Sequence, residues 1–157
     1  MANTKISHIN GSRKVAVSGM KEIYKPALGD GTAKPGDLVG IISTAGANKG
    51  KVVRTQLGGG TELETFIGIV DDLPTIAEDT AIPDGIPLNI IVPQSGHKYK
   101  VKAEDTGDAL SIEGFPMGFS STAGAMEDIA TMGTAGVKAN LDIAMVDNDT
   151  VAQVVWR

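Results

Sequence analysis

The chain has 157 residues, a formal net charge of −5 and no Cys. Without Cys it can form neither a disulfide nor a thiolate metal site, and it has no Cys nucleophile. The acidic balance argues against a broad nucleic-acid footprint, which needs clustered Lys and Arg, and against an anionic membrane surface. The 20 Gly and 7 Pro residues exceed the usual share and favour a protein of many short strands and turns.

The length favours a single domain with one core. No apolar run approaches the roughly 20 residues of a membrane-spanning helix. Residues 1–13 are polar, with Ile6 and Ile9 as isolated apolar points. We predict an N-terminal arm over residues 1–13 and a single β-domain over residues 14–157. The arm is either a disordered terminus or an extended segment on a neighbouring subunit, anchored by Ile6 and Ile9.

Short apolar runs separated by turn residues fill the rest of the chain. Lys34–Asp37 and Pro83–Gly85 are typical turns, since Pro fixes φ and Gly allows a positive φ. The rhythm predicts an all-β fold of eight to ten short strands, an antiparallel β-barrel or β-sandwich. At most one short helix is expected, over residues 125–132, where apolar residues recur at helical spacing. Residues 126–131 are also compatible with a strand. The clearest expected strands are 14–17, 22–25, 38–42, 51–55, 65–70, 87–93, 97–102, 141–145 and 151–156.

The strand expected over residues 97–102 alternates between two faces. Lys98, Lys100 and Lys102 share one face. Lysines in this arrangement are typical of a solvated edge that resists aggregation. The alternative is that the three lysines contact an acidic partner surface.

The sequence ends in an expected hairpin over residues 141–157. Residues 141–145 alternate in polarity, Asp147–Thr150 is a turn, and residues 151–156 return as a strand. In that last strand only Gln153 is polar. We therefore predict that both of its faces are covered, and that this hairpin closes a compact β-domain which packs against something else.

Residues suited to catalysis are sparse. His8 and His97 have no neighbouring ligands at metal spacing, so we predict no catalytic, cofactor-binding or metal site and no enzymatic activity. One alternative stays open. Gly68–Asp72 and Pro93–Gly96, among other pieces, resemble motifs of the dUTPases, which are trimeric all-β nucleotide hydrolases. The catalytic Asp would then fall near Asp71, although the order of the motifs along this chain differs from the order in that family.

A second resemblance carries our main functional expectation. The strand entry Pro35–Val39, the strand piece Gly68–Val70 and the Val-rich strand Val151–Val155 together resemble the small capsid decoration, or cement, proteins of tailed viruses. The similarity covers roughly residues 30 to 157, and this chain has a longer middle, from Pro74 to Thr134. The resemblance implies a structural virion protein, usually a homotrimer, that sits on the outer capsid surface and clamps subunits of the major capsid protein.

We expect the contacts of such a protein to come from the arm, the Lys-rich strand and the last strand. A carbohydrate-binding or tail-associated β-module is a further alternative, although Trp156 is the only Trp. No nucleic acid, membrane or cofactor is expected as a partner. The predicted interface residues are Ile6, Ile9, Lys98, Lys100, Lys102, Val151, Val155 and Trp156.

Overall fold

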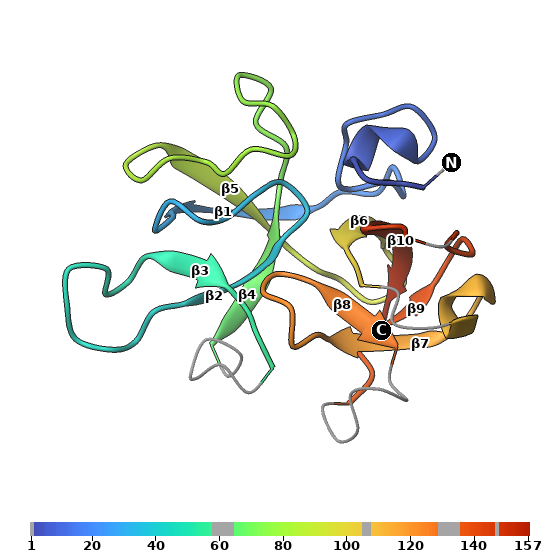
Figure 1. Ribbon diagram of the computed structural model, residues 1–157. Helices are drawn as coiled ribbons and strands as arrows, with labels where there is room; N and C mark the ends of the chain where they lie inside the picture. Colours follow the sequence, from blue (N-terminus) through green and yellow to red (C-terminus); the bar gives the residue numbers. More distant parts are fainter. Residues whose placement is uncertain (1, 58–64, 105–107, 129–135, 147) are drawn as a thin grey trace.

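The computed structural model describes residues 2–57, 65–104, 108–128, 136–146 and 148–157. Within this part of the chain, ten β-strands form two five-stranded antiparallel sheets, so the fold is an all-β sandwich, as predicted (Figure 1). The first sheet has the order β1-β5-β4-β2-β3 and the second the order β6-β10-β9-β7-β8. The strands are β1 Ile23–Leu28, β2 Leu38–Ile41, β3 Val52–Arg54, β4 Phe66–Val70, β5 Pro87–Val92, β6 Lys98–Lys102, β7 Pro116–Phe119, β8 Met126–Asp128, β9 Ala139–Leu141 and β10 Val151–Trp156. The two 3-10 turns are η1 Ile6–His8 and η2 Asp108–Ser111.

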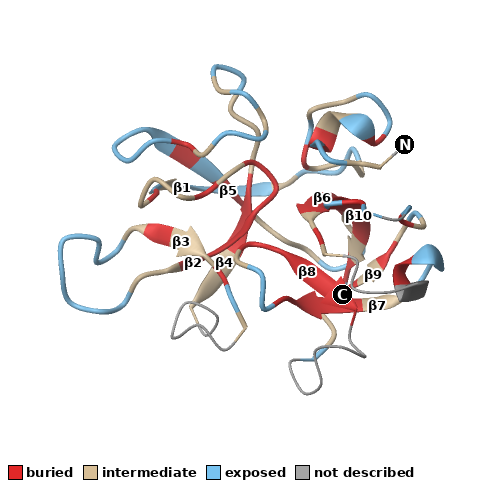
Figure 2. Ribbon diagram, viewed as in Figure 1, coloured by how far each residue is buried: buried red, intermediate tan, exposed pale blue. Residues whose placement is uncertain are grey.

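The main core lies where the two sheets face each other. Aromatic rings connect the two sheets: Phe66 of β4 stacks on Trp156 of β10 with 5.8 Å between ring centroids and meets Phe119 of β7 edge-on at 5.0 Å. A second, smaller apolar cluster lies on the other face of the first sheet. Figure 2 shows buried residues concentrated where the sheets meet, and exposed residues in the loops around them. The first sheet is therefore apolar on both faces, which explains why its strands read as short unbroken apolar runs.

The close approach of β4 and β5 depends on Gly68. A Cβ atom at this position would lie 2.1 Å from the carbonyl oxygen of Ile91 and 2.7 Å from Cγ2 of Ile90. Because Ile90 and Ile91 are both fully buried in β5, neither can move without disturbing the ladder. We expect Gly68→Ala to lower the free energy of unfolding by about 3 kcal/mol, the upper end for overpacking, as measured by chemical denaturation.

A matched control exists for this substitution. Gly46 has a φ of 151°, close to the 157° of Gly68, but nothing lies within 4 Å of its Cβ position. Gly46→Ala therefore imposes the strain of a positive φ without the clash, and we expect a loss of about 1–3 kcal/mol, smaller than the loss in Gly68→Ala. Equal losses in the two variants would contradict the packing explanation.

The N-terminal strap, as we call residues 2–13, packs on its own chain. Ile6 begins the 3-10 turn η1, and Ile9 directly follows this turn. The two residues are 1% and 8% exposed and belong to the main core cluster. Figure 1 shows the strap beside β6 and β10. The prediction that Ile6 and Ile9 anchor an arm on a neighbour is corrected. A spacing of three residues places both side chains on one side of a 3-10 turn, and this sandwich itself provides the apolar surface.

The segment after the strap, residues 14–17, covers the β6 edge of the second sheet. The Val17 amide donates to the Lys98 carbonyl at 2.9 Å, and the Lys100 amide donates to the Val15 carbonyl at 2.9 Å. The strand expected over residues 14–17 is thus reduced to a single bridge, between Ala16 and Tyr99. Strand addition occurs here, but within one chain, and it removes the β6 edge as a site for partners.

Two further expectations near the end of the chain need correction. The helix predicted over residues 125–132 is wrong where the chain is described: Met126–Asp128 form β8, paired with β7, and residues 129–132 lie outside the described residues. The closing hairpin exists, but its first strand is β9, at residues 139–141, not at 141–145. Met145 instead donates its amide to the Leu110 carbonyl of η2 at 2.8 Å, so the connection leaves the sheet early.

Candidate functional site

The most exposed apolar element is the edge strand β1. Five of its six residues are exposed, and Ile23, Tyr24 and Leu28 are 55%, 50% and 45% accessible. In the sheet it has one neighbour, β5. Edge strands with exposed apolar side chains are templates for association unless they are blocked. This strand is therefore the strongest candidate for an interaction surface.

Pro26 decides what kind of contact this edge can make. Pro26 pairs with Asn89 of β5, and the Asn89 carbonyl accepts the Asp71 amide at 2.9 Å. Asn89 thus points its backbone groups towards β4, so the nitrogen and carbonyl of Pro26 point away from β5, to the open edge. Pro has no N–H, so the open edge lacks a donor at its centre. Extension of the sheet by another strand is hindered here, and the apolar side chains are left as the binding groups.

A hollow of about 390 Å³ lies at the start of β1. It is lined by Met20 and Tyr24 together with Lys14, Glu22 and Asp71. The Glu22 carboxylate is held in place by two contacts: the Tyr99 hydroxyl donates to it at 2.7 Å, and His97 Nδ1 lies 2.6 Å from its other oxygen. Burial, together with Glu22, raises the pKa of Tyr99. The apolar edge therefore ends at a hollow with a fixed carboxylate.

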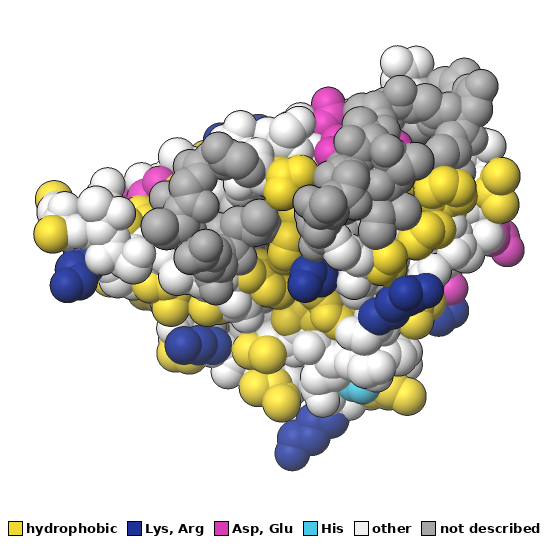
Figure 3. Space-filling view, turned by 90° about the horizontal axis from the view of Figure 1, so that it is seen from below, with side chains coloured by type: hydrophobic (Ala, Val, Ile, Leu, Met, Phe, Trp, Pro, Cys, Tyr) yellow, Lys and Arg dark blue, Asp and Glu magenta, His cyan; other side chains and the backbone are white. Residues whose placement is uncertain are grey.

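Exposed apolar side chains also occur elsewhere, but they do not gather in one element. Ile112, Ile143 and Val146 are 59%, 44% and 51% accessible and come from two connections. On the face shown in Figure 3, hydrophobic side chains are interspersed with separate Lys and Arg side chains. β1 is distinguished because Tyr24, Pro26 and Leu28, three successive positions on one face of the strand, are exposed and apolar.

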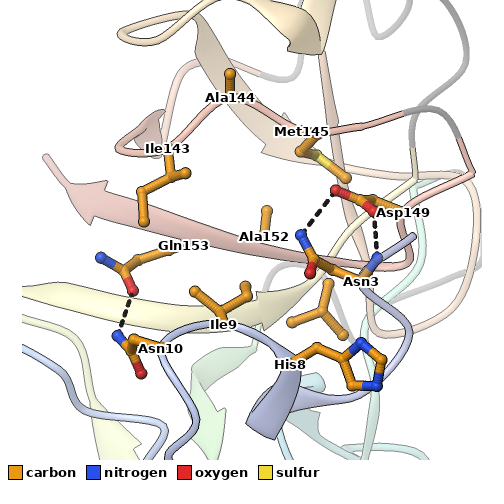
Figure 4. Close-up of a pocket in the computed structure, with 11 residues that line it drawn as sticks. Asn3, His8, Ile9, Asn10, Ile143, Ala144, Met145, Asp149, Ala152 and Gln153 are labelled. Carbon is orange, nitrogen blue, oxygen red and sulfur yellow. Dashed lines mark hydrogen bonds between the residues drawn. The ribbon is translucent and has the colours of Figure 1, made fainter. Parts of the chain in front are cut away.

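A pocket of about 230 Å³ separates the N-terminal strap from the connection between β9 and β10 (Figure 4). At one end, the buried Asp149 accepts the backbone and side-chain amides of Asn3. At the other end, Asn10 donates to Gln153 at 3.2 Å. Ile9 and Met145 supply the apolar lining between them. The chain itself satisfies the polar groups at both ends, so we interpret this pocket as the seam that holds the strap in place.

The predicted interface residues do not form one exposed patch. Lys98 pairs with Asp142 at 2.9 Å, Lys102 is partly buried, and Lys100 is completely buried, with its Nζ donating to the Ser12 carbonyl. Burial lowers the pKa of Lys100. Of the remaining predicted positions, Val155 is intermediate, and the buried ones are Ile6, Ile9, Val151 and Trp156.

The reason for this outcome is the strap. It lies over the face of β6 and β10 that carries Lys100 and Gln153, so the solvated Lys edge predicted from alternation is wrong. The prediction that β10 is covered on both faces is confirmed, since five of its six residues are buried. The chain's own N-terminus covers the face that carries Gln153, and on the other face Trp156 stacks on Phe66 of the first sheet. Sequence reasoning placed a strand over residues 22–25 but ended it at Pro26 and did not identify it as an interaction surface. Pro inside an apolar run was the signal of an edge strand.

The candidate acids and bases are dispersed. His8 lines the strap seam, whereas His97 is paired with Glu22, and Asp71 is half-buried beside Tyr24. Among the described residues, no group of three or more His, Asp or Glu is placed to hold a metal ion. In the same part of the chain, no helix has the length and apolar character to cross a membrane.

Comparison with known proteins gives no relative: no protein-family model matches the chain, and a search of curated proteins finds no significant match.

Proposed function

We propose that this protein is a structural virion protein that decorates the outer surface of a capsid and stabilises contacts between subunits of the major capsid protein. The observation that carries the proposal is the edge strand β1, whose large apolar side chains are exposed. The three motifs that resemble capsid decoration proteins support it. All three lie in or next to strands of the two sheets: Pro35–Val39 leads into β2, Gly68–Val70 lies in β4, and Val151–Val155 lies in β10. None of them lies in β1, which is therefore available to a partner.

The chemistry of β1 suits adhesion. Complete burial of an exposed Ile or Leu side chain contributes about 1.5–3 kcal/mol, and the large apolar side chains of β1 are about half exposed. Tyr24 and Leu28 share one face of the strand, so contact of that face with a coat subunit contributes roughly 1 kcal/mol for each of them. A homotrimer, which we also propose, presents three such strands to a symmetric shell. The linked contacts then raise the overall affinity by orders of magnitude.

Capsids of the virus that encodes this protein, prepared without it, provide the test. We expect saturable binding of the wild-type protein in a co-sedimentation assay. The double variant Tyr24→Ser, Leu28→Ser removes apolar contact area at exposed positions and should bind at least about tenfold more weakly, equivalent to about 1.4 kcal/mol. Ile112→Ser, at an exposed position outside β1, is the matched control and should bind like the wild type.

Capsid decoration and the role of β1 as the contact are tested separately. If the wild type does not bind capsids, decoration is rejected. If it binds and the double variant binds equally well, the function stands and β1 is not the contact. Release of pyrophosphate from dUTP with Mg²⁺, lost in Asp71→Asn, would support the dUTPase-like alternative instead, and specific hits in a glycan screen would support the carbohydrate-binding alternative.

A further inference from the structure

Three cationic side chains line one cavity at the junction of the two sheets. Lys34 precedes β2, Arg54 ends β3 and Lys102 ends β6, and together they border a space of about 390 Å³. No part of the proposed capsid contact uses this cavity. The elements that bring the cations together are adjacent because the Lys102 amide donates to the Gly36 carbonyl at 2.9 Å.

Asp37 is the buried carboxyl group of this cavity. It is 2% exposed, and one of its oxygens accepts the Lys34 amide at 2.8 Å. Gly124 forms the wall behind it: a Cβ atom there would lie 2.9 Å from the Asp37 carboxyl carbon and 3.1 Å from Cδ of Arg54. The side chains of Asp37 and Arg54 therefore pack against the same wall.

The Arg54 side chain has a hydrogen-bond donor without a partner. Its Nε atom is buried and has no hydrogen-bond partner in the described structure. The four ion pairs found between described residues involve none of Lys34, Arg54 and Lys102. A buried guanidinium donor without a partner is costly, and a small oxyanion would satisfy it.

The other carboxylates at the cavity are placed differently. Glu104 accepts the hydroxyls of Ser120 and Thr122 at 2.9 and 2.6 Å, so its charge is directed towards those donors. Asp79 is exposed to solvent, where water screens its charge. Neither is paired with the three cations within 4.0 Å in the described part of the chain.

We propose that this cavity binds a small tetrahedral oxyanion, of the size of sulfate or phosphate, held by Lys34, Arg54 and Lys102. The Arg54 guanidinium supplies the directional donors, and the two ammonium groups supply charge.

The proposal includes a dependence on pH. Asp37 faces Lys34, Arg54 and Lys102, and Asp79 and Glu104 also border the cavity. Burial raises the pKa of Asp37 to about 7, more than the neighbouring cations lower it. Below that pH, Asp37 loses its negative charge and no longer repels the anion. Sulfate should therefore bind more tightly at pH 6 than at pH 8.

Sulfate is the probe of choice because its charge does not change over this range. We expect saturable amide chemical-shift changes at Lys34 and Gly124 on titration with sodium sulfate, absent with sodium chloride at matched ionic strength. The affinity should fall at least about tenfold in Arg54→Gln and stay unchanged in Arg157→Gln, which changes an exposed Arg elsewhere. In Asp37→Asn, the affinity for sulfate should be the same at pH 6 and pH 8. A titration with phosphate measures the affinity for the second anion.

Each outcome bears on the proposal. Equal responses to sulfate and chloride, or an Arg54→Gln variant that binds as the wild type does, would overturn it. If Arg54→Gln fails to fold, Lys34→Gln at a partly exposed position provides the same comparison. Because the titration uses the isolated protein, its result does not depend on capsid binding.

Discussion

Ile6→Ala should lower the free energy of unfolding by about 2–5 kcal/mol, the range for removal of a buried branched side chain. Ile6 is 1% exposed and lies in the main core cluster. Its Cδ1 atom also packs against Gly36, 3.0 Å from the Cβ position of that residue. The loss should be equally visible in chemical denaturation and in the melting temperature, because the strap is part of the cooperative unit.

Ile112→Ala is the control for this prediction. Ile112 is 59% exposed, so the same truncation should cost less than about 0.5 kcal/mol. If Ile6→Ala has as little effect as Ile112→Ala, the strap is not docked in solution, and the original expectation of an arm free to reach a neighbour would regain support.

Asp37→Asn should change how stability depends on pH. The pKa of Asp37 is raised from 3.8 to about 7 in the folded protein by burial, so the folded state binds a proton more tightly than the unfolded state. The associated stabilisation is complete below about pH 4 and is lost as pH rises through about 7. At about 1.4 kcal/mol per pH unit, the wild type should lose about 4 kcal/mol between pH 4 and pH 8 that the variant does not lose. Urea denaturation at a series of pH values measures this difference.

Asp84→Asn is a useful comparison for the titration. Asp84 is exposed, and its hydrogen bond with Lys51 lowers its pKa, so any pH dependence it contributes has the opposite sign. Parallel stability curves for the wild type and Asp37→Asn would show that Asp37 is ionised at neutral pH in the folded protein.

Much of the sandwich could be predicted from the sequence because its strands are short apolar runs set off by turn residues. β2, β4 and β5 follow this pattern closely, and Pro35–Asp37 marks the entry to β2. The all-β class follows from the same pattern. For β8 the sequence left helix and strand both open, because Met126–Asp128 contain two acidic residues and their strand is fixed by pairing with β7, a contact between segments that local propensity does not encode.

The candidate site was less predictable, for a definite physical reason. Alternation along β6 gives the face on which Lys98, Lys100 and Lys102 lie, but not what covers that face. The strap does, and its docking depends on contacts far apart in sequence. β1 was the reverse case: Ile23, Tyr24 and Leu28 are apolar residues left in solvent, and hydrophobicity alone assigns such residues to a core.

The strap also has a consequence for biosynthesis. Asn3 leaves the ribosome early, yet its partner Asp149 is 146 positions further along the chain, next to β10, which occupies the inner part of its sheet between β6 and β9. Neither the sheet nor its cover can form until translation has reached that strand. The second sheet and the strap must therefore form late in synthesis, at the slow pace typical of non-local topologies, whereas all five strands of the first sheet lie within residues 23–92.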